Sequence, residues 1–199
     1  MPVIGATVAC LALAACGTPP WKQNDTAATP APTEISTTAE ATPTPKPAKV
    51  RNDLAKGSAR HQLGAGGVKI SVNYWSTLDI GQWTSAATKP LNLSMSASFN
   101  DGSKQNIYLR SLTVTTDVQG PEGALSSPEP LTDQAPVTPG YLVKAPSSYV
   151  KVFQIPEVEA GATAVTLNLT YDLLAQSAPK SKEYLSQSTS DTLVVPLAP

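Results

Sequence analysis

The sequence has very little cysteine: its only two cysteines, Cys10 and Cys16, both lie near the N-terminus. If the segment before Cys16 is removed, the remaining chain has no disulfide and no cysteine ligand for a metal. With His61 as the single histidine, a zinc or copper site of ordinary composition is also excluded. We therefore expect no metal, no cofactor and no catalysis by cysteine.

The sequence also lacks an excess of charge of one sign, has few aromatic residues and has no long apolar run. The net charge is −1 and the pI about 5.8, so no charge excess points to nucleic acid. No apolar run is long enough for a permanent transmembrane helix. Charged residues make up only 15% of a chain that contains 19 prolines. This mixture predicts one ordered part and one disordered part.

The N-terminal segment has the pattern of an export signal. Residues 3–13 form an apolar run of the length of a signal-peptide core. The run ends in Leu13-Ala14-Ala15-Cys16, which resembles the lipobox of bacterial lipoproteins. That resemblance implies cleavage before Cys16, a lipid on the Cys16 sulfur, and a location on the extracytoplasmic face of the cell membrane. A buried helix is the weaker interpretation, because Gly-Thr-Pro-Pro follows at once.

The start of this signal leaves two interpretations open. No lysine or arginine precedes the apolar run. Either translation starts upstream of Met1, or the signal is unusually weak.

Residues 16–58 form the predicted tether. The segment is dominated by Thr, Pro and Ala and cannot bury enough apolar surface to fold. Repeated prolines favour an extended spacer of about 3.1 Å per residue, which reaches on the order of 100 Å. Such Thr-Pro tracts resemble those of actinobacterial envelope proteins. Five basic residues between Lys46 and Arg60 could attract anionic polymer or lipid, but a solvated linker is the favoured interpretation.

From residue 59 to 199 the sequence predicts β-strands. Apolar residues alternate with polar ones over residues 68–74, 91–99 and 165–173, and a helix cannot place every second residue on one face. Less regular strands are expected over 149–155 and 192–197, and residues 59–63 should pair with the strand that starts at Val68. Over 106–118 the alternation changes parity near Arg110, which predicts either a bulge or a strand that changes sheets.

Together these patterns predict an all-β fold, an antiparallel sandwich of about seven strands. Residues 60–75 resemble the opening of immunoglobulin-like domains in small actinobacterial lipoproteins and secreted antigens. Residues 156–161 are similar to turns in adhesin-type immunoglobulin-like modules. The resemblance implies an immunoglobulin-like domain with a structural or binding role, although the Cys…Trp…Cys pattern of antibody domains is missing.

Few residues suggest chemistry. His61 has no accompanying nucleophile motif, and Glu157 and Glu159 lie on a turn bounded by Pro and Gly, where acidic residues are usually solvated. Trp75 should point away from the core and Trp83 follows in an irregular segment, so both are candidate ligand contacts. Alternatively, the loop over residues 78–83 covers Trp75.

The sequence therefore predicts a membrane-anchored, non-catalytic sandwich that acts by protein interaction or scaffolding in the cell envelope, without nucleic acid. An alternative is a module that binds carbohydrate or cell-wall polymer through Trp75 and Trp83. A hydrolase that uses acidic residues is a distant third.

Overall fold

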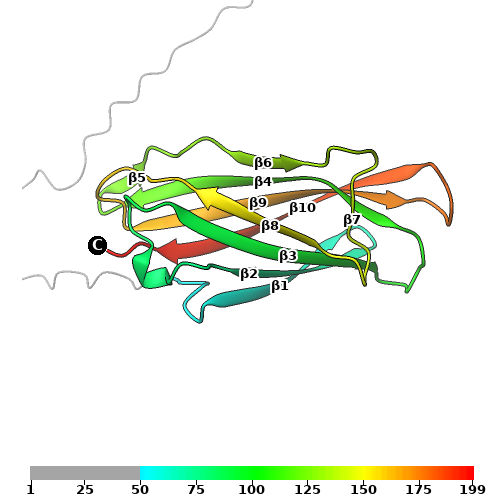
Figure 1. The fold of residues 1–199 in the computed structure, drawn as a ribbon, viewed down its shortest axis with the longest axis horizontal. Coiled ribbons are helices and arrows are strands. Elements are labelled where there is room, and N and C mark those ends of the chain that lie inside the picture. Colours follow the sequence, from blue (N-terminus) through cyan, green and yellow to red (C-terminus); the bar gives the residue numbers. More distant parts are fainter. Residues whose placement is uncertain (1–49) are drawn as a thin grey trace, which may run out of the picture. The chain divides into compact units, whose positions relative to one another are not determined.

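A computed structural model describes residues 50–199, and they form a two-layer, all-β sandwich (Figure 1). The first layer has the strand order β1-β2-β3-β8 and the second β10-β9-β4, with three short strands on the far side of β4. All strand pairs are antiparallel, which confirms the expected fold class. The expected signal peptide, lipobox residues Leu13, Ala14 and Ala15, Cys16 and most of the tether lie outside the described residues.

The strands have the following bounds: β1 Ser58–Ala65, β2 Val68–Trp75, β3 Lys89–Phe99, β4 Ile107–Gly120, β5 Gly123–Leu125, β6 Leu131–Gln134, β7 Tyr141–Leu142, β8 Tyr149–Ile155, β9 Ala164–Gln176 and β10 Tyr184–Pro196. A 3-10 turn, η1 (Ile80–Gln82), lies between β2 and β3. Among residues 50–199, no helix has the length and apolarity that crossing a membrane requires.

The alternating residues of β2, β3 and β9 form the centre of the core, as the sequence predicts. Every apolar position of β2 and β9 on the predicted inner face is buried, and β3 follows the same pattern up to the half-buried Phe99. Alternation specifies these strands because a shift of one residue would move a whole apolar set into solvent.

The chain crosses between the layers in a Greek-key pattern. β3 leads into β4 of the second layer, β8 returns to pair with β3, and β9 then pairs with β4. Seven strands have seven residues or more, which matches the expected number. The sequence does not indicate the three short strands, because each pairs with β4 over no more than four residues.

Two features of the long strands can be compared with the sequence. The register between β4 and β9 shifts between Leu109 and Ser111, which confirms the predicted bulge. β10, however, begins at Tyr184 and not at residue 192 as expected. Residues 186–192 of β10 are polar on both faces, so this part shows no alternation, and the ladder with β9 defines it instead.

Both ends of the described chain lie at one end of the sandwich. The Asp53 amide donates to the Val194 carbonyl at 2.9 Å, and the Ala198 amide donates to the Trp83 carbonyl at 2.8 Å. Leu54 is buried, so the core extends further toward the N-terminus than the expected boundary at residue 59. The turns after β1, β3 and β9 lie at the opposite end (Figure 1).

Candidate interaction surfaces

A carboxylate joins the two layers where β1 faces β10. The Oδ2 atom of Asp191 on β10 accepts a hydrogen bond from the Tyr74 hydroxyl at 2.7 Å and lies 2.7 Å from Nδ1 of His61. The Tyr171 hydroxyl lies 2.7 Å from that of Tyr74. Because Tyr74 donates its proton to Asp191, Tyr171 donates to Tyr74. We call these four residues the His61 cluster.

The geometry of the His61 cluster favours a structural role. Burial raises the pKa of the Tyr74 hydroxyl far above its ordinary value, and burial also raises that of Tyr171. Both tyrosines therefore stay neutral and hydrogen-bonded. In the part of the chain that the structure describes, the side chain of His61 bonds only to Asp191, and no serine or threonine hydroxyl bonds to the ring. The cluster links the sheets and lacks the nucleophile that a catalytic His–Asp pair would serve.

A second carboxylate joins the layers on the other side of the sandwich. Asp133 on β6 accepts hydrogen bonds from the Tyr149 hydroxyl at 2.6 Å and from Nζ of Lys151 at 2.5 Å, both on β8. Burial alone would raise the Asp133 pKa, but the bonds from Lys151 and Tyr149 outweigh it and hold the pKa below the usual range. The bond to Asp133 raises the Lys151 pKa in turn.

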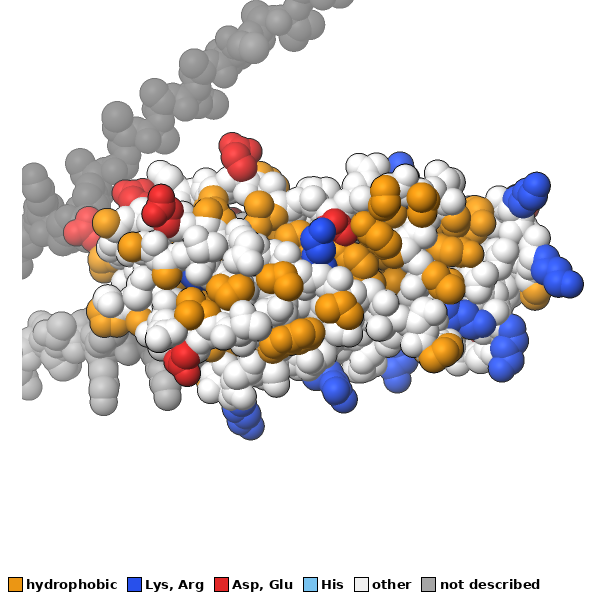
Figure 2. Space-filling model, in the orientation of Figure 1, with side chains coloured by type: hydrophobic (Ala, Val, Ile, Leu, Met, Phe, Trp, Pro, Cys, Tyr) orange, Lys and Arg blue, Asp and Glu red, His pale blue; other side chains and the backbone are white. Residues whose placement is uncertain are grey.

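Beside this ion pair, three of the exposed large apolar side chains of residues 50–199 lie close together. β8 is the edge strand of its sheet, and its outward-facing Val150 and Val152 are 60% and 43% exposed. Leu142 on β7 is exposed as well and lines a depression together with Tyr141 and Val150. Hydrophobic side chains gather there beside an adjacent basic and acidic group (Figure 2). We call Tyr141, Leu142, Val150 and Val152 the β8 surface.

The edge strand β10 of the other sheet differs from β8 in chemistry. Apart from the exposed Leu185 near its start, its outward positions in the exposed part are Ser186, Ser188, Ser190 and Thr192. The outward face of β3, next to β8, carries Asn92 and three serines. Since a solvated strand face normally carries polar residues, the valines of β8 distinguish this edge.

The two predicted tryptophan contacts have different positions. Trp75 is half-buried on the outer face of its sheet, where the alternation places it. Trp83 is 0% exposed in the core, and its Nε1 donates to Ser76 Oγ at 3.1 Å. The expectation that Trp83 contacts a ligand is therefore wrong, because the short η1 turn folds its indole inward and no ring face reaches the surface.

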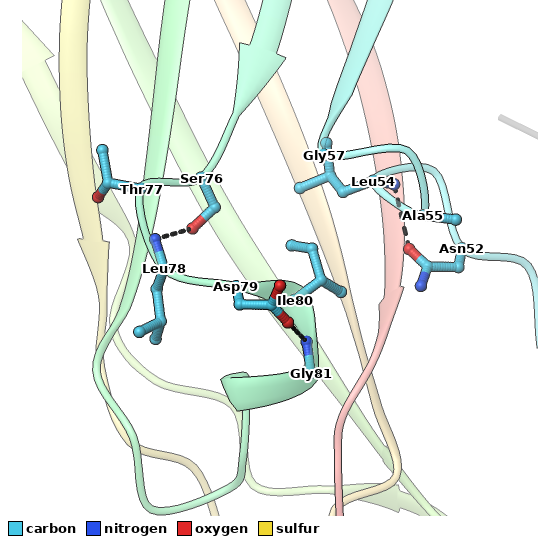
Figure 3. A pocket seen from close by; sticks show the side chains of 10 residues that line it. All are labelled: Asn52, Leu54, Ala55, Gly57, Ser76, Thr77, Leu78, Asp79, Ile80 and Gly81. Carbon is cyan, nitrogen blue, oxygen red and sulfur yellow. Dashed lines mark hydrogen bonds between the residues drawn. The ribbon is translucent and has the colours of Figure 1, made fainter.

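A pocket lies between the segment 52–57 and the loop 76–81 (Figure 3). Its polar groups hold its own walls: Asn52 Oδ1 accepts from the Leu54 amide at 3.1 Å, and Asp79 Oδ1 accepts from the Gly81 amide at 2.7 Å. Ser76 Oγ likewise accepts from the Leu78 amide at 3.1 Å. Because these groups are satisfied locally, we assign no ligand to the pocket.

Glu157 and Glu159, the acidic residues considered for catalysis, lie apart from the pocket and from both carboxylates that join the layers. Glu157 and Glu159 are exposed in the loop between β8 and β9, and Glu159 accepts a hydrogen bond from the Ser126 amide at 3.3 Å. Neither lines the pocket of Figure 3. Within residues 50–199, no group of three or more metal-ligating side chains is placed to hold a metal ion.

Comparison with known proteins adds no further assignment. No model of a protein family matches the chain, and no curated protein is similar to it in sequence.

Proposed function

We propose that this chain is a lipid-anchored, non-catalytic binding protein of the bacterial cell envelope, whose immunoglobulin-like domain engages a protein partner through the β8 surface. The Greek-key crossing from β3 to β4 and back to β8 supports the immunoglobulin-like class. The motif Leu13-Ala14-Ala15-Cys16 supports the lipid anchor. The single observation that carries the binding proposal is the apolar outer face of the edge strand β8.

An edge strand offers two kinds of contact to an incoming strand. Every second residue of an antiparallel edge points its N–H and C=O groups away from the sheet, where a partner strand can pair with them. The alternate side chains then decide which strand fits. Here these are Val150 and Val152, which favour a β-branched, apolar partner strand, while Tyr141 provides an aromatic contact beside them.

Lys151 is the residue that would normally discourage such pairing, since an edge lysine protects a sheet from other strands. Its Nζ pairs with Asp133 on the inner side of β8, so the carboxylate offsets its charge there, while 40% of the lysine side chain stays exposed. The edge therefore presents its apolar residues without an opposing charge on the outer face.

Site-specific crosslinking in cells tests the proposal. A photo-crosslinking amino acid is placed at Val150 or Val152 of the full chain, and at Ser188 or Ser190 on the polar edge strand β10 as matched controls. We expect one discrete protein adduct from the β8 positions and none from the β10 positions. Equal adducts from both edges, or none from β8, would contradict the proposed surface.

The anchor has a separate test. Replacing Cys16 with alanine removes the sulfur that would carry the lipid, so we expect an unprocessed precursor that is not labelled by a radioactive fatty acid. A correctly cleaved, soluble product from the Cys16→Ala chain would show that the segment is an ordinary signal peptide.

A second candidate function, binding of cell-wall carbohydrate, now depends on Trp75 alone. Trp75 is half-buried on the outer face of its sheet, so part of its ring is open to solvent, whereas its register partner Asn92 is buried and its side chain is not open to a ligand. A partly exposed tryptophan ring is a surface on which a sugar ring can stack. Retention of the chain on purified cell wall, lost in Trp75→Ala and kept in Val150→Lys, would support this candidate over the protein partner.

A further inference from the structure

The end of the sandwich away from the chain termini carries the β1–β2, β3–β4 and β9–β10 turns together with the segment after β7. Four lysines lie there: Lys104 on the β3–β4 loop, Lys144 after β7, and Lys180 and Lys182 on the β9–β10 turn. β10 starts at this end and finishes at the other, where Val194 bonds to Asp53. This end is thus the part of the described domain furthest from the residue where the predicted tether enters.

A chain of hydrogen bonds connects the four lysines. Lys144 Nζ donates to the Lys104 carbonyl. Asn106 and Gln176 then join the β3–β4 loop to β9, with the Gln176 amide donating to the Asn106 carbonyl at 3.0 Å. Gln176 Nε2 donates to the carbonyl of Ser181, which lies between Lys180 and Lys182, at 2.6 Å. These hydrogen bonds hold together the loops that carry the four lysines, so the lysines form one surface.

The charges of this surface are largely uncompensated. Lys104, Lys180 and Lys182 are exposed, and no ion pair within residues 50–199 includes any of the four lysines. Asp101 and Glu183 are the acidic residues of the same loops. Figure 2 shows basic side chains at this end and acidic ones at the end near the C-terminus.

This segregation matters because the chain as a whole has a net charge of −1. A polyanion gains nothing from the average charge of such a protein and must be attracted by a local patch. The loops of the opposite end carry the exposed acidic residues Asp79, Glu122, Glu157 and Glu159, beside the exposed cations Arg51 and Lys56. A polyanion is therefore attracted to the four-lysine end more than to the end near the C-terminus.

We propose that the four-lysine end binds a polymer of repeating phosphate groups. Lysine is a flexible point charge without the rigid fork that lets arginine select one carboxylate or phosphate geometry. Four lysines on loops suit a repeating anion, which can be held in many registers, better than one shaped protein site. Within residues 50–199, these loops themselves hold no exposed large apolar side chain, and the nearest ones along the chain are Leu142 and Leu185, two residues from Lys144 and Glu183. The site borders the β8 surface at Leu142 but shares no residue with it, and it does not depend on the proposed function.

Binding of fluorescent long-chain inorganic polyphosphate to the full chain in a zwitterionic detergent tests the proposal. The test variant carries Lys104→Gln, Lys180→Gln and Lys182→Gln. The control carries Arg51→Gln, Lys56→Gln and Arg60→Gln, three exposed positions outside this end, and changes the net charge equally. We expect the test variant to bind polyphosphate at least about 10-fold more weakly. The slope of the logarithm of its binding constant against the logarithm of the salt concentration should be smaller in magnitude by about two, because fewer counterions are released. The control should bind like the unchanged chain.

Two results would overturn the proposal. Equal weakening in both variants would mean that polyphosphate responds to total charge and that no local site exists. Binding to phosphatidylglycerol vesicles but not to polyphosphate, with the same dependence on the lysines, would assign the surface to lipid head groups. Unchanged circular dichroism of both variants provides the control for folding.

Discussion

The two buried tyrosines of the His61 cluster allow a sharp test of how the sheets are joined. Tyr171 donates to Tyr74, and Tyr74 donates to Asp191, with both bonds 2.7 Å long. Tyr171→Phe removes the first bond only, so it should cost about 1 kcal/mol of the free energy of unfolding. Tyr74→Phe removes both bonds and leaves the Tyr171 hydroxyl buried without a partner, so we expect a cost of about 3 kcal/mol.

The double variant distinguishes a connected network from two separate contacts. Tyr74→Phe/Tyr171→Phe has no orphaned hydroxyl, so it should cost about 2 kcal/mol, less than Tyr74→Phe alone. Urea unfolding followed by tryptophan fluorescence measures all four proteins, and an unchanged dependence on urea confirms that the unfolded states are comparable. Additive losses, or a Tyr74→Phe variant as stable as Tyr171→Phe, would refute the order of hydrogen bonds from Tyr171 through Tyr74 to Asp191.

Two further predictions concern single residues. Trp83→Ala should lower the free energy of unfolding by about 3–5 kcal/mol because it opens a cavity in the core. Trp75→Ala, on the outer face, should lower it far less. Equal losses for the two variants in urea unfolding would contradict the different burial of the two tryptophans. The lowered Asp133 pKa means that its contribution to stability is complete above about pH 4 and is lost as the pH falls through the folded-state value. Asp133→Asn should therefore lose less stability than the unchanged protein between about pH 4 and pH 2, and parallel acid-unfolding curves would argue against this.

The sequence predicts those parts of the fold in which one face is buried. In β2, β3 and β9 the alternation of apolar residues determines both the strand and the side that faces inward. The parity change near Arg110 likewise marks the bulge in β4. The first half of β10 and the short strands β5–β7 show no such signal, because long-range pairing with β9 and β4 determines them.

The candidate surface is only partly visible in the sequence. Residues 149–155 have apolar residues on both parities, which is consistent with an edge strand that carries valines on its outer face. The exposure of Val150 and the position of Leu142 beside it depend on where β7 and β8 lie, and local patterns do not determine that. For Trp83 the prediction is wrong because an irregular segment has no periodicity from which to infer burial.

The central claim is that the β8 surface binds a protein partner, and loss of binding on its disruption tests it most directly. Val150→Lys/Val152→Lys replaces the exposed valines, and Ser188→Lys/Ser190→Lys makes the same charge change on β10. If each valine contributes about 1 kcal/mol when buried, the β8 variant should bind the crosslinked partner roughly 30-fold more weakly or worse. The β10 variant should bind it normally. A β8 variant that retains full affinity would contradict the account.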